Sequence, residues 1–275
     1  MKINYVLNEI KLMLKTAVIE ENENEAVLIV SYVLNIKPGV VATTEEISES
    51  NYKKVLKIAK IRCKRIPLQY IIKSAEFINT KLIINKNVLI PRPETELLTD
   101  IIIKRINESS GDIKVLDLCC GSGCIGIAIA KNTKAEVHLA DVSKKALKVA
   151  KKNCKINDVN LKIIHSNLFN KITNKYNIIV SNPPYIKESE IDGLQYEVKK
   201  EPLLALSGKE DGLYFYKEII NKARNHLTNS GEIYFEMGSN QGENITKLLE
   251  KDFKNIRILK DYYNNERFIT AVLKD

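Results

Sequence analysis

The sequence predicts an α/β protein in which a small helical bundle precedes a mostly parallel sheet covered by helices. Three observations support this prediction. Apolar residues recur at helical spacing through residues 1–75, strands and helices alternate from residue 113 onward, and a glycine-rich turn joins the first of those strands to its helix. The strands are almost continuously apolar, which is typical of a parallel sheet buried on both faces.

Size and composition limit the class of protein. At 275 residues the chain is long enough for one large domain and one small domain. With 44% hydrophobic and 28% charged residues, it is neither disordered nor collagen-like. No apolar run is long enough to cross a membrane and the first residues lack a signal-peptide pattern, so we expect a cytosolic protein. The five cysteines are an odd number with no nearby histidine, and we therefore expect reduced thiols and no metal site.

The first 75 residues are predicted to form the helical bundle. Val6, Ile10 and Leu14 share one helix face, and a third helix is expected to begin at a capping box formed by Thr43 and Glu46. Residues 76–92 alternate between apolar and polar side chains around Asn-rich turns, which predicts a β-hairpin linker.

The remaining residues, 93–275, are predicted to form the α/β domain. Pro93 and the two glutamates after it favour the start of a helix. Strands are expected at 113–118, 135–141, 161–165, 176–181, 231–236, 254–260 and 267–273, and helices at 97–106, 124–131, 143–156, 211–226 and 241–251. No helix separates the last two strands, so the sheet should end in an antiparallel hairpin. Residues 187–210 show no clear regular structure, which is typical of a functional loop.

The glycine turn predicts a nucleotide-like ligand. Gly121, Gly123 and Gly126 follow a strand and open a helix, in the pattern GxGxxG. A pyrophosphate at this turn would meet the carboxylate of Asp117 at the end of the strand, whereas a cationic amino group would be attracted to it. This favours S-adenosylmethionine, which carries an ammonium and a sulfonium but no phosphate, over a nicotinamide dinucleotide.

Polar residues at the next two strand ends fit the rest of such a donor. Asp141 ends the second strand, where a carboxylate can accept both ribose hydroxyls. Asn167 and Leu168 follow the third strand, where they could bind the edge and the face of adenine.

The segment Asn182-Pro183-Pro184-Tyr185 predicts the acceptor. Two prolines remove the local N–H donors, so the side-chain oxygen of Asn182 and the carbonyl of Pro183 are free to accept the two hydrogens of a planar amino group. Tyr185 could stack on that group and hold it in line with the donor methyl. From this chemistry alone, a glutamine amide and the exocyclic amines of adenine, cytosine and guanine all remain possible.

Several motifs in order along the chain resemble the HemK/PrmC family of peptide chain release factor glutamine methyltransferases. They are Pro67-Leu-Gln-Tyr-Ile71, Pro91-Arg-Pro-Glu-Thr-Glu96, Asp117-Leu-Cys-Cys-Gly-Ser-Gly123, Ser181-Asn-Pro-Pro-Tyr-Ile186, Glu201-Pro202 and Asp211-Gly-Leu213. The resemblance implies a Rossmann-like class I methyltransferase domain that methylates the glutamine of a Gly-Gly-Gln motif, with S-adenosylmethionine as donor and S-adenosylhomocysteine as product. It also implies that the helical domain binds the release factor.

The resemblance and the pattern together assign the site residues. Those expected to bind the donor are Asp117, Cys119, Cys120, Gly121, Ser122, Gly123, Asp141, Asn167, Leu168 and Asn182. Those expected to bind the substrate are Arg92, Glu94, Thr95, Asn182, Pro183, Pro184 and Tyr185, of which Asn182, Pro183 and Tyr185 are the catalytic group.

Two donor positions depart from the family pattern. Cys119 stands where glycine is usual, and we expect its backbone to avoid a positive φ angle. Asn167 stands where an acidic residue is usual, so it keeps an acceptor oxygen but lacks the charge.

The net charge of +9 leaves a second interpretation open. A basic protein can bind nucleic acid, and a nucleic-acid amino-methyltransferase would use the same Asn-Pro-Pro-Tyr chemistry. The lysines are nevertheless scattered, as on solvated surfaces, and no aromatic and basic stacking surface is visible. We therefore expect a protein substrate, no direct binding of nucleic acid or membrane, and a monomer.

Overall fold

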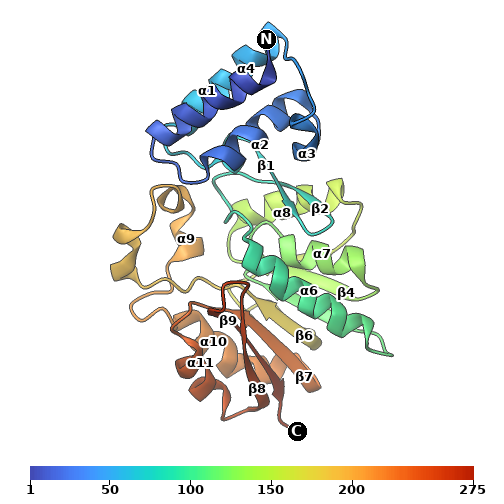
Figure 1. Cartoon of the computed structure of the whole chain (residues 1–275). Helices are drawn as coiled ribbons and strands as arrows, with labels where there is room; N and C mark the ends of the chain where they lie inside the picture. The colour runs from blue at the N-terminus through green and yellow to red at the C-terminus, as the bar shows by residue number, and fades with distance from the viewer. The chain divides into compact units, whose positions relative to one another are not determined.

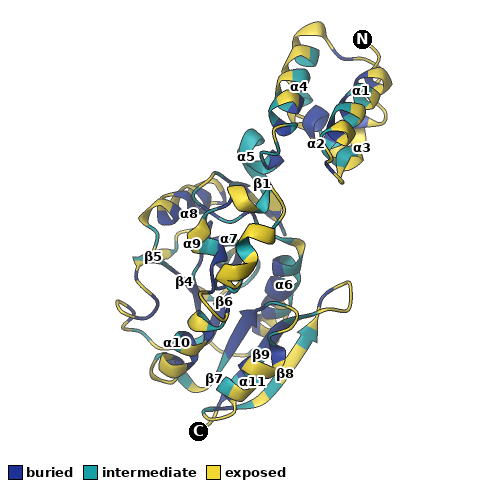
Figure 2. Cartoon of the chain, turned by 90° about the vertical axis from the view of Figure 1, so that its left-hand side faces the viewer, coloured by how far each residue is buried: buried dark blue, intermediate teal, exposed yellow.

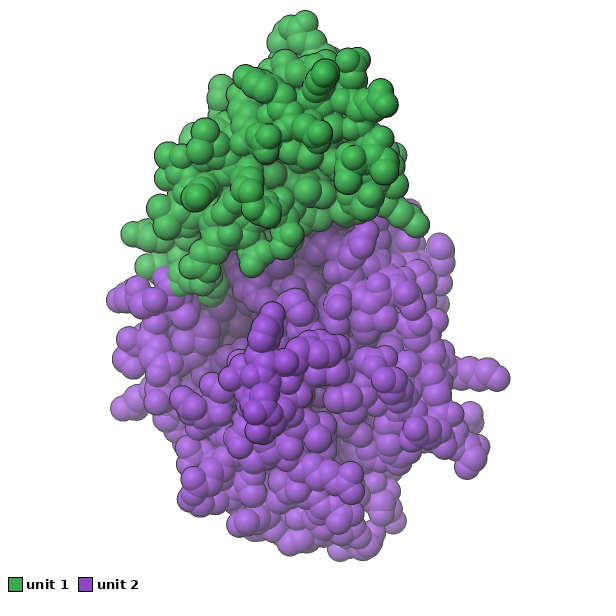
Figure 3. Space-filling view, in the orientation of Figure 1, with its two compact units in different colours: residues 1–73, 195–200 green, residues 74–194, 201–275 purple.

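The computed structural model describes residues 1–275 and divides them into two compact units (Figures 1 and 3). Unit 1 consists of Met1–Lys73 and Gln195–Lys200, and unit 2 of Ser74–Leu194 and Glu201–Asp275. The predicted hairpin groups with unit 2. The inclusion of residues 195–200 in unit 1 was not predicted.

Unit 1 is helical, as expected. Its helices are α1 (Ile3–Thr16), α2 (Asn22–Leu34), α3 (Pro38–Val41), α4 (Glu49–Arg62) and α5 (Leu68–Ile72). The predicted face of α1, formed by Val6, Ile10 and Leu14, is fully buried, and it packs in one apolar cluster with Val30 of α2 and Val55 of α4. The helical spacing read from the sequence therefore corresponds to the core of this unit.

The predicted start of the third long helix was wrong. α4 begins at Glu49, because the side chain of Ser48 caps it by accepting a hydrogen bond from the backbone of Asn51 (3.3 Å). The hydroxyl of Thr43 instead donates to a backbone carbonyl three residues earlier, and Glu46 forms an isolated bridge with Lys2. Both Thr43 and Ser48 are good capping residues, and only packing selects between them.

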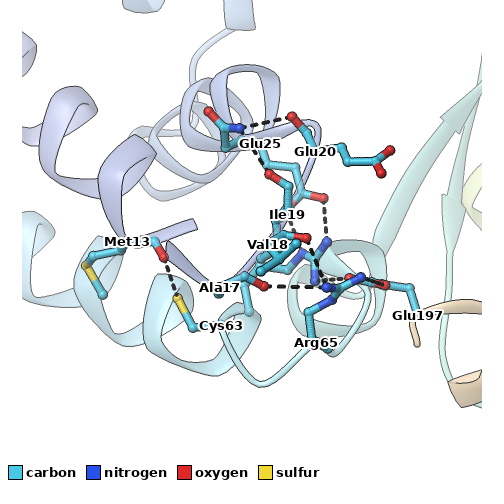
Figure 4. A network of polar contacts seen from close by, with 11 residues as sticks. Met13, Ala17, Val18, Ile19, Glu20, Glu25, Cys63, Arg65 and Glu197 are labelled. Atoms are coloured by element: carbon cyan, nitrogen blue, oxygen red, sulfur yellow. Dashed lines mark hydrogen bonds and ion pairs between the residues drawn. The ribbon is translucent and has the colours of Figure 1, made fainter. Parts of the chain in front are cut away.

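The buried Arg62, the half-buried Arg65 and two glutamates form a polar cluster inside unit 1 (Figure 4). Arg62 donates to Glu25 (2.6 Å) and to Glu197 (2.8 Å), and Arg65 donates twice more to Glu197. Burial raises the pKa of Glu197, but the hydrogen bonds from Arg65 and Arg62 outweigh it and lower the pKa to about 2. The cluster therefore joins residues 195–200 to the helices with its charges paired.

Unit 2 contains a seven-stranded sheet in the order β5-β4-β3-β6-β7-β9-β8. Its strands are β3 (Lys114–Leu118), β4 (Glu136–Asp141), β5 (Lys162–His165), β6 (Tyr176–Ser181), β7 (Leu227–Glu236), β8 (Phe253–Lys260) and β9 (Glu266–Leu273). The strands β3 to β7 are mutually parallel, and β9 lies between β7 and β8, antiparallel to both. This confirms the predicted parallel sheet with an antiparallel end.

Helices cover both faces of the sheet (Figures 1 and 2). Gly126 of α7 (Cys124–Asn132) packs against Leu139 and Val137 on one face, and α7 contacts both α6 (Pro93–Asn107) and α8 (Lys144–Ile156). On the other face, α10 (Tyr214–Ala223) and α11 (Gly242–Leu249) share an apolar cluster with Leu116 and Leu118 of β3. Alternate residues of β3 thus face opposite helix layers, which explains why its sequence is apolar throughout.

The predicted hairpin is present, but it consists of β1 (Ser74–Phe77) and β2 (Thr80–Ile83) and therefore lies earlier than the predicted range of 76–92, since residues 84–92 form no strand. Asn153 of α8 and Asn157, which caps the C-terminal end of that helix, hold β2 by its backbone. Asn153 accepts from the N–H of Ile83 (2.7 Å), and Asn157 accepts from the N–H of Lys81 (3.2 Å). These contacts explain why the hairpin groups with unit 2.

The connection 187–210 is more regular than predicted. It contains the 3-10 helices η1 (Glu188–Gly193) and η2 (Val198–Lys200) and a single-turn helix α9 (Leu203–Leu206). Backbone bonds fix its end to the segment that follows β6, since Ile186 donates to Leu206 (3.0 Å) and Gly208 donates to Ile186 (2.7 Å). No helix in the chain is long and apolar enough to span a bilayer.

Candidate active site

A cleft in unit 2 runs along the carboxyl ends of β3, β4, β5 and β6. It encloses about 1010 Å³ of empty space, counting the part open to solvent. Among the predicted residues it is lined by Thr95, Cys119, Cys120, Gly121, Ser122, Asp141, Asn167, Leu168, Asn182 and Pro184. Asp117, Gly123, Arg92, Glu94, Pro183 and Tyr185 do not line it.

The glycine turn forms one end of the cleft. Gly121 and Gly123 have φ angles of 54° and 79°, in the left-handed region that glycine adopts without strain. Gly126 is required for another reason, because a Cβ there would lie 2.2 Å from the side chain of Leu139. The three glycines thus give the turn its shape and seat α7 directly on the sheet.

Cys119 contradicts the prediction made for it. Its φ angle is 63°, so a residue with a Cβ occupies the conformation in which glycine would be unstrained. Leu168, on the same cleft, is also left-handed, with a φ angle of 45°. Strained backbone of this kind clusters at ligand sites, and here two instances border one cleft.

Asp117 lies behind the glycine turn rather than in the cleft wall. Its side chain is fully buried, Oδ2 accepts from the backbone N–H of Gly126 (2.9 Å), and Oδ1 has no partner. Burial raises the pKa of this carboxyl to about 7. A buried carboxylate oxygen without a donor is a costly arrangement unless a cationic or donor group of a ligand satisfies it.

Asp141 supports the turn and also lines the cleft. Its Oδ2 accepts from the N–H of Gly121 (2.9 Å) and its Oδ1 from the N–H of Ser143 (2.7 Å). Burial raises its pKa, and the hydrogen bonds from Ser143 and Gly121 oppose that rise. Each carboxylate oxygen has a second lone pair, so the group can still accept hydroxyl donors of a ligand.

The Asn-Pro-Pro-Tyr segment forms the other end. Asn182 donates from its amide nitrogen to the hydroxyl of Thr95 (3.4 Å), whereas its side-chain oxygen and the carbonyl of Pro183 accept no hydrogen bond from within the chain. The two predicted acceptors are therefore free to receive a ligand. Pro183 and Pro184 are buried, and their packing fixes the backbone that carries the two acceptor oxygens.

Residues distant in sequence hold this segment in place. Gln241 donates to the carbonyl of Tyr185 (3.1 Å), and a Cβ at Gly208 would lie 2.7 Å from the backbone of Tyr185. Burial raises the pKa of the Tyr185 hydroxyl to about 12. Sequence analysis missed Gln241 as a supporting residue, and no local pattern points to it.

Glu236 is the most informative residue that the sequence analysis missed. It ends β7, is 2% exposed, and accepts a hydrogen bond from Thr95 (2.6 Å), which in turn accepts from Asn182. Because β7 neighbours β6, its final residue must lie beside the end of β6. A search for carboxylates at adjacent strand ends would have found it.

The residues of the segment 91–96 that were predicted to bind the substrate lie in different surroundings. Thr95 lines the cleft, whereas Arg92 forms an ion pair with the buried carboxylate of Glu201. Glu201 also accepts from the N–H of Ile90 (2.9 Å), so it binds this segment to the end of the 187–210 connection. The loop residues 87–89 and Phe215 line the cleft as well and were not predicted.

Comparisons with known proteins match both parts of the chain. The family profile "Methyltransferase small domain" matches residues 93–199, and "PrmC N-terminal domain" matches residues 6–72. A protein of Thermodesulfovibrio yellowstonii named "Release factor glutamine methyltransferase" is 39% identical over 90% of this chain and 91% of its own length. A protein of Clostridium acetobutylicum with the same name is 36% identical over 99% of both chains.

Solved structures support the fold. A 16S rRNA methyltransferase from T. thermophilus, solved with AdoMet and guanosine, superposes with a TM-score of 0.54 at 19% identity. The match covers 73% of this chain and 50% of that one. It confirms the class I methyltransferase fold that the family resemblance implied.

Proposed function

The chain belongs to the release factor glutamine methyltransferase family, and we propose that it methylates the side-chain amide nitrogen of the glutamine in the Gly-Gly-Gln motif of peptide chain release factors. The donor in this proposal is S-adenosylmethionine. The observation that carries the proposal is the unbonded side-chain oxygen of Asn182, which lines one end of a cleft whose other end is a glycine turn, with the unbonded carbonyl of Pro183 next to it in the chain.

The residues around the glycine turn, which we call the donor end, fit this donor. Behind the glycine turn, the unpartnered oxygen of Asp117 places a buried negative charge that attracts an ammonium group to this end of the cleft, and the spare lone pairs of Asp141 suit two ribose hydroxyls. Asn167 and Leu168 line the region expected to hold adenine. When bound, the donor supplies an electrophilic methyl group on a positively charged sulfur.

The other end of the cleft, which we call the acceptor end, orients the nucleophile. It consists of Thr95, Asn182–Tyr185 and Glu236. A glutamine side chain has a planar NH₂ group, and accepting both of its hydrogens on Asn182 and Pro183 leaves the nitrogen lone pair directed away from them. As the new bond forms, positive charge develops on the nitrogen and strengthens both hydrogen bonds. The site therefore stabilises the transition state more than the ground state.

No strong general base is needed for this reaction. The amide proton becomes acidic only after the nitrogen begins to carry positive charge, so the proton can leave late, from a nitrogen whose hydrogens are held by the oxygens of Asn182 and Pro183. This is consistent with an acceptor end in which no histidine lines the cleft.

We also propose that unit 1 binds the body of the release factor. Tyr5 and Leu12 lie one heptad apart on α1, on the same helix face, and are 62% and 65% exposed. Replacing both with serine should raise KM for the whole release factor and leave KM for a short Gly-Gly-Gln peptide unchanged. An unchanged KM for the whole factor would contradict this role.

The proposed activity can be tested directly. Purified release factor, incubated with the enzyme and a donor labelled in its methyl group, should gain one labelled methyl on the Gly-Gly-Gln glutamine, as located by tandem mass spectrometry. A release factor whose motif glutamine is replaced by asparagine serves as the control. Failure of the native factor to gain the label would contradict the proposal.

One observation favours a second candidate, a nucleic-acid amino-methyltransferase. Helix α8 exposes six lysines on one face and contains no acidic residue; they are Lys144, Lys145, Lys148, Lys151, Lys152 and Lys155. Such a face can bind phosphates. The same labelled donor should be offered with total RNA, and transfer to RNA in place of the release factor would support this candidate.

A further inference from the structure

The acceptor end contains a chain of hydrogen bonds that runs from a buried carboxylate to the proposed catalytic amide. Glu236 accepts from the hydroxyl of Thr95 (2.6 Å), and that hydroxyl accepts from the amide nitrogen of Asn182 (3.4 Å). Glu236 and Thr95 are 2% and 3% exposed. The two residues come from β7 and α6, so three separate elements meet at this point.

The number of protons available fixes which residue donates and which accepts in each of these hydrogen bonds. A threonine hydroxyl has one proton, and an ionised carboxylate can only accept. Thr95 must therefore donate to Glu236, which leaves its oxygen able only to accept from Asn182. The end of the Asn182 amide that faces Thr95 is then its NH₂ group, and its oxygen is directed to the opposite side.

The orientation of this amide decides whether a substrate NH₂ group can bind. With its oxygen toward the substrate, Asn182 accepts a hydrogen bond. After a 180° flip it would present its own NH₂ to the substrate NH₂, and two donors would oppose each other. The two orientations have nearly the same shape, so packing alone does not choose between them.

We propose that Glu236 and Thr95 are positioning residues that hold the Asn182 amide with its oxygen toward the substrate by means of this hydroxyl relay. This inference rests on the proposed function for its role in catalysis. The relay itself, as an arrangement of three side chains, can be tested without any substrate.

The environment of Glu236 makes the relay sensitive to protonation. Burial raises the pKa of Glu236 to about 7, while the hydrogen bond from Thr95, the charge of Arg267 and the nearby amide of Asn182 oppose the rise. Arg267 also lies beside Asp261 (3.6 Å), with which its charge is shared. The other titratable or charged groups that act on Glu236, or that its charge acts on, are Glu94, Cys124, Tyr185 and Tyr216.

Protonation would undo the direction of the relay. A neutral Glu236 could donate to the oxygen of Thr95, and the hydroxyl proton of Thr95 would then be free to point at Asn182. That arrangement favours the flipped amide. We therefore expect kcat to fall as the pH drops below about 7, and we expect Glu236→Gln to remove this part of the pH profile.

The first test measures kcat, KM and the donor dissociation constant for three variants of α6. Thr95→Val removes the hydroxyl with little change in shape and should lower kcat about tenfold, the effect of roughly one hydrogen bond, with the donor dissociation constant unchanged. Thr95→Ser keeps the hydroxyl and should restore most of the rate. Thr99→Val removes a buried hydroxyl one turn further along α6 and is the matched control. It should leave the rate within about twofold of the native value, because its hydroxyl donates only to the backbone carbonyl of Thr95 and not to the Thr95 side chain, Glu236 or Asn182.

The second test needs no substrate and keeps the relay testable if Thr95→Val does not fold. The ¹⁵N resonance of the Asn182 side-chain amide should shift with pH in the native protein, with a midpoint close to neutral, and should stay constant in Glu236→Gln. A resonance that titrates identically in both proteins would overturn the relay, and so would a kcat in Thr95→Val equal to that of the native enzyme. If the native enzyme does not methylate release factor at all, the proposed function fails, while this titration still decides the relay.

Discussion

The donor end of the cleft is built from backbone turns that follow three neighbouring strands, whereas the acceptor end is built from side chains that are distant in the sequence. Gly121 and Asp141 at the donor end bond to each other across adjacent strand ends. At the acceptor end, Asn182 depends on Thr95 from α6 and on Glu236 from β7. Because the two ends are built from different parts of the chain, substitutions should affect them separately. We expect substitutions at the donor end to weaken donor binding and those at the acceptor end to lower kcat.

The largest expected effect is at the acceptor end. Asn182→Ala removes one of the two acceptor oxygens, and kcat should fall by about 100- to 1000-fold, the loss typical of deleting one contact that strengthens in the transition state. The donor dissociation constant, measured by calorimetry, should change little. A matching loss in donor binding would show that Asn182 serves the donor more than the acceptor.

A smaller effect is expected at the donor end. Asp141→Asn removes the charge that accepts from the turn and from the proposed ribose hydroxyls, and donor binding should weaken by about 10- to 100-fold, which corresponds to one or two charge-assisted hydrogen bonds. At saturating donor, kcat should remain close to the native value. An unchanged dissociation constant would mean that the ribose contact lies elsewhere.

The pH dependence of donor binding sharpens the same comparison. Burial raises the pKa of Asp117 to about 7, and an ammonium binds the ionised carboxylate, so donor affinity should rise by roughly tenfold between about pH 6 and about pH 8. Asp117→Asn should flatten this profile. Affinity that is independent of pH in the native protein would contradict the assignment of Asp117 to the ammonium.

The stability of the ligand-free protein should depend on pH in the opposite direction to donor affinity. A carboxyl whose folded-state pKa is raised contributes stability that is present below its unfolded-state pKa and is lost as the pH rises through the folded-state value. For Asp117 the pKa rises from 3.8 to about 7, so the free energy of unfolding without donor should fall across that interval. Glu236 contributes in the same direction.

The smallest expected effect concerns the strained turn. At an ordinary φ angle, glycine is less stable than alanine by roughly 0.5–1 kcal/mol, but a positive φ costs a residue with a Cβ roughly 1–2 kcal/mol. Because Cys119 has a φ angle of 63°, Cys119→Gly should be more stable than Cys119→Ala in urea unfolding. The reverse order would show that the turn is not strained.

The parts predicted correctly from the sequence depend on local patterns. The helical face of α1 and the glycine turn follow from spacing alone, and Asn182, Pro184 and Asp141 line one cleft because the carboxyl ends of parallel strands meet at one edge. Such features need only the order of residues within a strand, turn or helix.

The parts that the sequence did not predict depend on packing between distant segments. The cap of α4 falls at Ser48 rather than Thr43 because tertiary contacts select between two suitable residues. Cys119 adopts a positive φ because the turn around it is fixed by its neighbours. The support of Asn182 by Thr95 and Glu236 joins two residues that are 141 positions apart and requires knowledge of which strands are adjacent.

We infer that donor binding and acceptor orientation are separable. The decisive measurement is the donor dissociation constant of the native enzyme, Asn182→Ala, Asp141→Asn and the double variant. We expect Asp141→Asn to weaken donor binding equally with and without Asn182→Ala, and Asn182→Ala to leave donor binding unchanged with and without Asp141→Asn. A dissociation constant that Asn182→Ala raises as much as it lowers kcat would contradict the claim.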